Sequence, residues 1–291
     1  MNRLAESWRA RGGVRVLDGR DIFVVDIPAR RPTDRPPLLV LHGFPTSSFD
    51  FHRVVDRLAE TRPVVLFDML GYGLSAKPDL AYDMGLQADL AVALVDSLGW
   101  DRLGLLTHDV GDTVGGELLA RQLEGRWDVE VADRTLTNGS IYIGLAHLSA
   151  GQLFLLDLPD ERLGVEDAPG QATVTGGIAA TLSPATPSDE EEATAQWQMI
   201  AHHDGHRLLP RLIRYIEERR RHESRFTGAI EDHPSPLAVV WGRDDPIADV
   251  AMTERLRSAR PDIRLEVLGG VGHYPMVEAP DRFVEAVLAS G

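Results

Sequence analysis

The fold is decided by residues 103–123, "LGLLTHDVGDTVGGELLARQL", where an apolar, strand-like run turns directly into a helix-like pattern. The turn consists of Thr107, His108, Asp109, Val110 and Gly111. A strand that enters a helix through such a tight turn is typical of G-x-S-x-G sequences, which hold a serine nucleophile up for attack. Asp109 takes the place of that serine here, so the chemistry of this corner must be that of a carboxylate.

Outward from this turn, buried-strand and helix patterns alternate along the chain. A hairpin is predicted over residues 14–28, about an Asp18–Gly19 turn. The further predicted strands lie within 36–45, 62–75, 103–108, 131–140, 235–247 and 263–275, and helices are predicted over 49–60, 86–100, 250–260 and 279–290. Such alternation predicts a mostly parallel, eight-stranded sheet with helices on both faces. Ligands of such sheets bind at the carboxyl ends of the strands.

The rhythm changes after Ser140. From about 141 to 231 no buried strand is expected; a stretch rich in Gly, Ala, Thr and Pro (164–187) is followed by two helix-like segments. Ser188 and Glu191 have the spacing of a capping box at the start of the first segment. We therefore predict a core domain formed by residues 1–140 and 232–291, and an inserted helical cap, or lid, formed by residues 141–231.

Composition limits the partners of the protein. The 45 acidic side chains outnumber the 30 basic ones, for a formal net charge of -15. This charge argues against binding to nucleic acid or to anionic membrane surfaces. There is no cysteine, and therefore no disulfide or thiol nucleophile. No stretch approaches the roughly 18 apolar residues of a membrane span, and the N-terminus has no signal-like apolar region. We expect a cytoplasmic protein that acts on a small molecule.

Reactive groups follow three of the predicted strands, in the order Asp109, Asp245 and His273. Nucleophile, acid and histidine follow one another in this order in α/β-hydrolases. The chain resembles that superfamily in five ordered motifs: "HGFP" (42–45), "DMLGYGLS" (68–75), "HDVG" (108–111), "WGRDDP" (241–246) and "GHYP" (272–275). The aspartate at the turn further resembles the branch that contains epoxide hydrolases and haloalkane dehalogenases. The resemblance implies a catalytic triad of these three residues.

Within that branch, four further segments look most like the hydrolases related to mesoderm-specific transcript protein. These segments are "HDVGDTVGGELLAR" (108–121), "NGS" (138–140), "HHDGH" (202–206) and "RYIEER" (214–219). We take no activity from this resemblance.

A carboxylate nucleophile divides the reaction into two steps. A serine must lose a proton before it attacks, whereas an aspartate side chain with an ordinary pKa near 4 is already ionised at neutral pH. Asp109 can therefore attack a saturated carbon and form an alkyl ester. His273, held by Asp245, would then remove a proton from the water that cleaves this ester. The backbone amides of Phe44 and Val110 are expected to form the oxyanion hole, and Phe44–Pro45 is expected to be a cis peptide.

Several of these residues also have a possible structural role. Asp is a preferred helix N-cap, so capping is the structural alternative for Asp109. Asp244 competes with Asp245 for the role of the acid; the position directly before Pro246 matches the family motif and favours Asp245. The cluster at 202–206 lacks the ligand spacing of a zinc site, and we expect a turn there. No metal or cofactor is expected.

The residues around Asp109 indicate which leaving group is displaced. The resemblance to dehalogenases leads us to expect a halide-binding tryptophan after the nucleophile and a second donor after "HG", but Val110 and Phe44 occupy these positions. An epoxide instead needs O–H donors from the lid. Tyr215 and Tyr142 match the two lid tyrosines of epoxide hydrolases in number and approximate place, and Trp197 is a third candidate. Packing in the lid is the alternative role for Tyr215 and Trp197.

We therefore predict a cofactor-independent hydrolase whose partners are an apolar organic substrate and water, with opening of an epoxide as the favoured reaction. Carbon–halogen hydrolysis is the first alternative. A ligand-binding protein with an idle triad on the hydrolase scaffold is the second.

Overall fold

The computed structural model describes residues 1–31 and 33–289. Its centre is one sheet with the strand order β1-β2-β4-β3-β5-β6-β7-β8. Strand β2 pairs antiparallel with β1 and β4, and all other neighbours are parallel, so the predicted fold class is confirmed. The strands are β1 (Gly12–Leu17), β2 (Arg20–Ile27), β3 (Leu38–Leu41), β4 (Val64–Phe67), β5 (Arg102–His108), β6 (Glu130–Thr137), β7 (Leu237–Gly242) and β8 (Arg264–Leu268).

The first two strands form the predicted hairpin. Asp18 (φ 48°) and Gly19 (φ 72°) are both left-handed, as a two-residue type I′ turn requires. Three strands of the sheet are apolar and fully buried: every residue of β3, β4 and β7 is inaccessible to solvent or nearly so. Strands with both sides buried need a helical layer on each face of the sheet.

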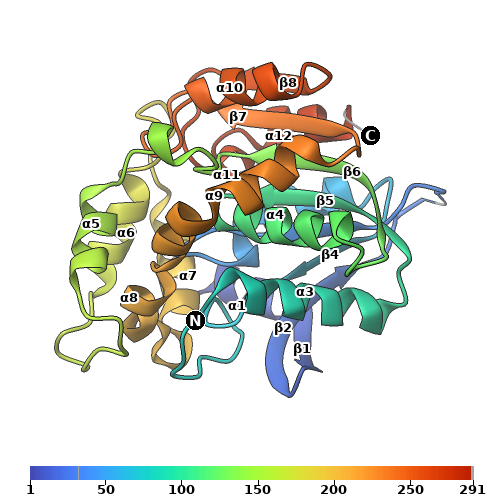
Figure 1. Cartoon of the computed structure of the whole chain (residues 1–291). Coiled ribbons are helices and arrows are strands. Elements are labelled where there is room, and N and C mark those ends of the chain that lie inside the picture. The colour runs from blue at the N-terminus through green and yellow to red at the C-terminus, as the bar shows by residue number, and fades with distance from the viewer. Residues whose placement is uncertain (32, 290–291) are drawn as a thin grey trace.

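Helices α3, α4 and α9 cover the face toward the viewer in Figure 1, with α4 in contact with both α3 and α9. Helices α2 and α12 contact each other in the opposite layer. Outside the segment between β6 and β7, the helices are α1 (Arg3–Arg9), η1 (Ser48–Phe51), α2 (Val55–Leu58), α3 (Met84–Leu98), α4 (Val110–Leu123), α10 (Ala251–Ala259), α11 (Pro275–Glu278) and α12 (Pro280–Leu288).

The segment between β6 and β7 is helical, and Figure 1 shows α5, α6 and α8 gathered at one end of the sheet. The last helix of the segment runs from there back to the core, where Phe226 packs on α4. It thus belongs in part to the layer that covers the sheet. The elements are η2 (Ile143–Leu145), α5 (Ala150–Asp157), α6 (Gln171–Ala179), α7 (Glu190–Ile200), η3 (His202–Leu208), α8 (Leu209–Leu212) and α9 (Tyr215–Asp232).

One predicted cap is wrong. Helix α7 begins one residue later than expected, because Asp189 is its N-cap and accepts a hydrogen bond from the Glu192 amide. A capping box is found instead at the start of α5, between Ser149 and Gln152. Among the helices of the described residues, none combines the length and the apolar character needed to cross a membrane.

Candidate active site

Asp109 lies at the corner between β5 and α4 in a strained backbone conformation (φ 49°, ψ -109°). Such a conformation costs on the order of 1–3 kcal/mol for a residue with a side chain, and it tends to occur at functional sites. The turn is also tightly packed: a Cβ on Gly111 would lie 2.4 Å from the carbonyl oxygen of Leu41. The local sequence therefore holds the Asp109 side chain at the carboxyl end of the central strand.

Thr107 stands where the G-x-S-x-G motif has its first glycine, and it fits there without disturbing the turn. Its hydroxyl group donates to the Asp112 carboxyl group, one turn into α4. Gly115 makes room for the threonine methyl group, since a Cβ at that position would lie 3.0 Å from it. A glycine in the helix thus compensates for the larger residue in the strand.

The Asp109 carboxylate does not cap its helix. Asp109 stands at the N-cap position of α4, but no side-chain capping bond forms. Its Oδ2 instead accepts the backbone N–H of Phe44 at 3.0 Å. Val110 is the first residue of α4, where a backbone N–H has no partner within the helix. The Phe44–Pro45 peptide is cis, as predicted.

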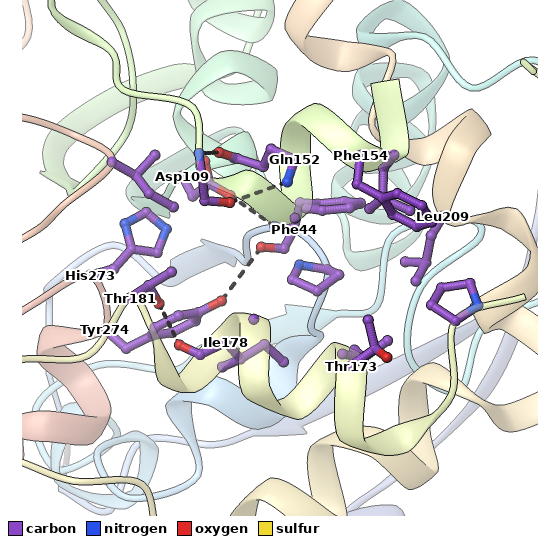
Figure 2. Close-up of a pocket in the computed structure, with 18 residues that line it drawn as sticks. Phe44, Asp109, Gln152, Phe154, Thr173, Ile178, Thr181, Leu209, His273 and Tyr274 are labelled. Carbon is purple, nitrogen blue, oxygen red and sulfur yellow. Dashed lines mark hydrogen bonds between the residues drawn. The ribbon is translucent and has the colours of Figure 1, made fainter. Parts of the chain in front are cut away.

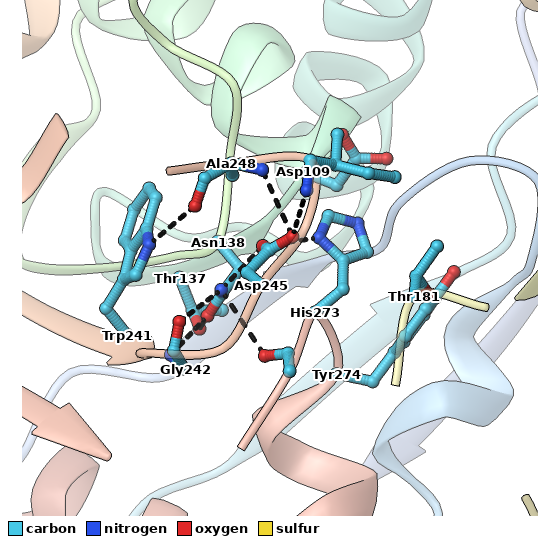
Figure 3. A network of polar contacts seen from close by, with 12 residues as sticks. Asp109, Thr137, Asn138, Thr181, Trp241, Gly242, Asp245, Ala248, His273 and Tyr274 are labelled. Atoms are coloured by element: carbon cyan, nitrogen blue, oxygen red, sulfur yellow. Dashed lines mark hydrogen bonds and ion pairs between the residues drawn. The ribbon is translucent and has the colours of Figure 1, made fainter. Parts of the chain in front are cut away.

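Two further loops bring Asp245 and His273 together. The Nδ1 of His273 is 2.7 Å from Oδ2 of Asp245, and both side chains are buried (Figure 3). The backbone amides of Ile247 and Ala248 donate to the other carboxylate oxygen at 2.8 and 3.1 Å. With Nδ1 committed to this contact, Nε2 is the nitrogen of His273 that can act on a water. Asp244 is exposed and pairs with Ser183 instead.

Asn138 is part of the same network; it follows the preceding strand, where some dehalogenases place the acid, but its side chain is an amide and cannot serve as an anion. Its Nδ2 donates to Asp245 Oδ2 at 2.7 Å, and its Oδ1 accepts the Gly242 amide at 2.9 Å. Asn138 thereby fixes the carboxylate that orients the histidine. The left-handed φ of 48° at Asn138 directs the chain out of β6 at this point, a conformation that asparagine tolerates better than most residues.

The charges of the site act on His273. Burial lowers its pKa, but the charge and hydrogen bond of Asp245 and the charges of Asp109 and Glu278 outweigh burial and raise the pKa to about 9. Burial also raises the pKa of Asp245, but His273 and the other hydrogen-bond donors bring it below its usual range. Asp245 and His273 are therefore held as an ion pair while Asp109 is charged.

A cavity opens above Asp109 and His273 (Figure 2). Its empty space is about 660 Å³, including the open mouth. Most of its lining is apolar and comes both from the core and from α5, α6 and α8. The apolar lining residues are Phe44, Pro45, Phe154, Leu155, Pro169, Val174, Ile178, Leu209 and Ile247, with the two glycines 151 and 177. The arrangement suits an apolar molecule whose reacting atom lies against the carboxylate.

Two of the three expected lid donors lie elsewhere. The Tyr142 hydroxyl donates to Glu231 at 2.5 Å, and the Tyr142 ring lies under the Arg255 guanidinium. Trp197 packs on the His206 ring in the cap. Neither residue lines the cavity. The predictions of Tyr142 and Trp197 as donors do not agree with these positions; the sequence indicates that an aromatic is present but not which way it turns.

Tyr215 packs against Phe44, the residue whose amide binds Asp109. Its ring is 5.6 Å from the Phe44 ring, and its side chain is almost fully buried. Burial and, after it, the charge of Asp109 raise the pKa of Tyr215. Of the three candidates, Tyr215 is the one that packs against Phe44, although, like the other two, it is not among the residues that line the cavity.

Gln152 was missed by the sequence analysis. Its Oε1 accepts the Ser149 amide at 2.9 Å, so its NH₂ group is the part left to face other partners. The side chain lines the cavity with Asp109 and hydrogen-bonds with Tyr215. A glutamine three residues after a serine signals a helix cap, and nothing in that spacing indicates a second role.

Arg219 was also missed, although it belongs to the quoted segment 214–219. It is 3% exposed, and its Nη2 is 3.3 Å from the backbone carbonyl oxygen of Asp109. A buried arginine is rare unless it has partners, and this one lies directly behind the nucleophile position. Arginines are common on helix surfaces, so no sequence signal separates Arg219 from its exposed neighbour Arg220.

The remaining histidines of the motifs have structural partners. His42 Nε2 accepts the Met69 amide at 3.0 Å, and His108 Nε2 is 2.8 Å from the His273 carbonyl oxygen. Residues 202–206 form a turn in η3, with left-handed His203 and Asp204. In the part of the chain that the structure describes, no three His, Cys, Asp or Glu side chains are grouped as metal ligands.

The fold and this site define an α/β-hydrolase: a nucleophile position on a strained strand-to-helix turn, with the acid and the histidine after the last two strands. The sequence matches the alpha/beta hydrolase family over residues 38–286, and the chain belongs to this family.

Curated relatives cover most of the chain. The "Putative hydrolase LipZ" of Mycobacterium tuberculosis is 40% identical over 89% of each chain. The mesoderm-specific transcript homolog protein of Bos taurus is 30% identical over 97% of this chain and 86% of its own length. The predicted resemblance to mesoderm-specific transcript protein is therefore confirmed.

Solved structures show the same fold at lower identity. The haloalkane dehalogenase DbeA from Bradyrhizobium elkani USDA94 aligns with a TM-score of 0.74 over 96% of each chain, with 20% identity. An alpha/beta hydrolase fold protein from Burkholderia ambifaria aligns with a TM-score of 0.73 and 23% identity, over 95% of this chain and 97% of its own. At these identities the likeness shows the fold alone.

Proposed function

We propose that this hydrolase opens an apolar epoxide to a diol through a covalent ester on Asp109. In the first step an oxygen of the carboxylate attacks an epoxide carbon, the carbon–oxygen bond of the ring breaks, and the freed oxygen takes a proton from a donor in the cap. In the second step water attacks the carbonyl carbon of the ester and releases the diol.

The observation that carries the proposal is the position of the Asp109 carboxylate. One of its oxygens accepts the Phe44 amide, in the place that an oxyanion would occupy, and the carboxylate lines the same cavity as His273. The second oxygen is then the one available to attack. Backbone donors that are already in place can stabilise the oxyanion of the second step by roughly 2.7–4 kcal/mol each.

His273 is suited to the second step only. Because the charge of Asp109 helps to raise the pKa of His273 to about 9, the imidazole holds a proton before the ester forms. Ester formation removes that charge and lowers the pKa, which favours the neutral base that activates water. Neutral His273 therefore becomes available as a base in the second step, which needs it.

The leaving atom of the proposed substrate is an oxygen. Gln152 brings an N–H group to the cavity lining, and Tyr215, outside that lining, hydrogen-bonds with Gln152; a basic alkoxide requires donors of these kinds. The residues that line the cavity include no tryptophan, and Val110 and Phe44 carry no donor in their side chains. Halide displacement is correspondingly less favoured.

The proposal is tested by incubating the purified protein with styrene oxide, aryl glycidyl ethers and 1-bromoalkanes, and measuring diol and bromide. Diol formation that is lost in Asp109→Asn supports it. Bromide release without diol formation would replace it with the dehalogenase alternative. No product from any of the three substrate classes would favour the ligand-binding alternative.

Tyr215→Phe and Tyr142→Phe form a matched pair for the donor. Each removes one buried hydroxyl group. We expect Tyr215→Phe to slow diol formation by about 10- to 100-fold, because the alkoxide loses a proton donor. Tyr142→Phe should leave turnover within about twofold, since its hydroxyl group faces Glu231. Equal rates in both variants, measured by product formation at matched protein concentration, would remove Tyr215 from the mechanism.

A further inference from the structure

Arg219, in the predicted cap, is a buried cation that lies beside the backbone of Asp109. Arg219 of α9 donates from Nε to the Thr113 hydroxyl group at 2.8 Å and from Nη2 to the Asp109 carbonyl oxygen at 3.3 Å. Its distance to the carboxylate is longer, 3.9 Å from Nη2 to Oδ1. The guanidinium is therefore fixed by two neutral oxygens, and its charge lies beside the carboxylate without a hydrogen bond to the oxygen that attacks.

Asp109 is the carboxylate that balances this charge at neutral pH. The other candidate is Asp112, which is fully buried. Burial raises the pKa of Asp112 to about 8, so its carboxyl group is protonated and neutral at pH 7. A buried cation without a counter-ion is strongly unfavourable, so Arg219 and Asp109 depend on each other.

The same cation lies beside the expected proton donor. The Arg219 guanidinium is 5.0 Å from the centre of the Tyr215 ring. Asp109 raises the pKa of Tyr215, while Arg219 acts in the opposite direction. When Asp109 becomes a neutral ester, the repulsion disappears and the attraction of Arg219 remains.

We propose that Arg219 is a positioning residue that balances the negative charge of the site as this charge moves from Asp109 to the leaving oxygen and Tyr215. The inference rests on the proposed function. As the Asp109–carbon bond forms and the ring carbon–oxygen bond breaks, the electron pair passes to the epoxide oxygen, which takes the Tyr215 proton. Negative charge then lies on the tyrosine oxygen, and Arg219 is its counter-ion.

The contacts of Arg219 explain how it could act without moving. Two hydrogen bonds to fixed oxygens hold the guanidinium before the substrate arrives, so no reorganisation is needed during the reaction. Because the charge is needed while it is being transferred, we expect Arg219 to matter most for ester formation.

The experiment measures ester formation alone. In His273→Gln, which should stall at the ester, the rate of adduct formation with an accepted epoxide is followed by intact mass spectrometry after rapid quenching. Adding Arg219→Ala should slow this rate by about 100-fold or more. Guanidinium chloride at tens of millimolar should restore at least a tenth of the lost rate of adduct formation. Urea, which has the same shape without the charge, should not.

Three comparisons decide the outcome. Arg221→Gln removes an exposed arginine of the same helix and should leave the rate within twofold. If Arg219→Ala does not fold, Arg219→Lys and Arg219→Gln replace it, and the lysine variant should be at least tenfold faster. A rate in Arg219→Ala close to that of its parent, equal rescue by urea, or equal Lys and Gln variants would overturn the inference alone. No adduct in the His273→Gln parent would overturn the proposed function and this inference with it.

Discussion

At the scale of single residues, the exchange of serine for aspartate at the corner after β5 changes what the other residues must do. A serine nucleophile needs the histidine from the first step, whereas a carboxylate needs it only for the second. The proposed division rests on His273, which is held as the partner of Asp245 and has a pKa raised to about 9.

We predict that Asp109→Asn lowers the pKa of His273 from about 9, because the substitution removes one of the charges that raise it. The pKa falls because the imidazolium cation is less stable with fewer negative charges nearby, and it therefore loses its proton at lower pH. The measurement is a pH titration of the His273 ring signals by NMR.

Asp244→Asn is the control for this titration. Asp244 is next to Asp245 in the sequence, but it is exposed and pairs with Ser183. Its replacement should therefore leave the pKa of His273 unchanged. A His273 pKa that stays at about 9 in Asp109→Asn would show that the nucleophile and the base are not electrostatically coupled.

The sequence predicts the positions of residues that belong to a motif at the end of a strand. It does not predict the positions of residues that depend on how helices pack. Asp109, Asp245 and His273 follow strands whose ends must meet at one edge of the sheet. Gln152 and Arg219 lie on cap helices, whose rotation and contact with the core depend on long-range packing that one sequence does not display. For the same physical reason, the expected role of Tyr142 does not agree with the position of its hydroxyl group on Glu231.

At the scale of elements, α9 decides the geometry of the site from the cap side. Its first turns carry Tyr215 and Arg219, and its later turns pack on α4, which begins directly after Asp109. The contact is close: a Cβ on Gly116 of α4 would lie 2.7 Å from the Phe226 carbonyl oxygen. Because this contact is with backbone and not with a flexible side chain, α9 would have to move to relieve it.

Gly116→Ala should therefore lower the free energy of unfolding by about 1–3 kcal/mol through overpacking. It should also reduce turnover, because a displaced α9 carries Arg219 away from Asp109. Urea unfolding followed by circular dichroism measures the first effect, and diol formation the second.

Gly228→Ala in α9 is the matched control. A Cβ at this position meets no atom within 4 Å, so only helix propensity changes and the variant should gain up to about 1 kcal/mol. If Gly116→Ala were as stable and as active as Gly228→Ala, the seating of α9 on α4 would not control the site.

Strands were easier to predict than caps. The apolar runs of β3, β4 and β7 are buried on both sides, and this pattern survives any small error in boundaries. The start of α7 depends on which of two adjacent polar residues, Ser188 or Asp189, reaches the free amides. The two have similar capping preference, so the sequence could not separate them.

At the scale of the whole molecule, α1 joins the cap to the core. Asn2 contacts α7 through the Gln198 side chain and the Glu191 carbonyl oxygen, at 2.5 and 2.7 Å. At the other end of the helix, Trp8 is buried against Phe49, and its indole N–H donates to Ser48 at 3.3 Å. This short helix thus contacts both parts of the predicted domain division.

Trp8→Ala should weaken this connection. We expect a loss of about 3–5 kcal/mol in the free energy of unfolding, together with faster amide hydrogen exchange in residues 190–200. Arg3→Ala, on the exposed side of the same helix, should change stability by less than about 0.5 kcal/mol. If exchange in α7 did not change in Trp8→Ala, α1 would not hold the cap in place.

The covalent role of Asp109 can be tested by intact mass spectrometry of His273→Gln with an accepted epoxide. We expect a stoichiometric adduct with the mass of the substrate, located on the peptide that contains Asp109 and absent at early times from Asp109→Asn. A single turnover of the wild type in heavy-oxygen water should then give unlabelled diol and a labelled Asp109. Label that enters the diol in the first turnover, with no adduct in His273→Gln, would show that water attacks the substrate directly and that Asp109 forms no ester.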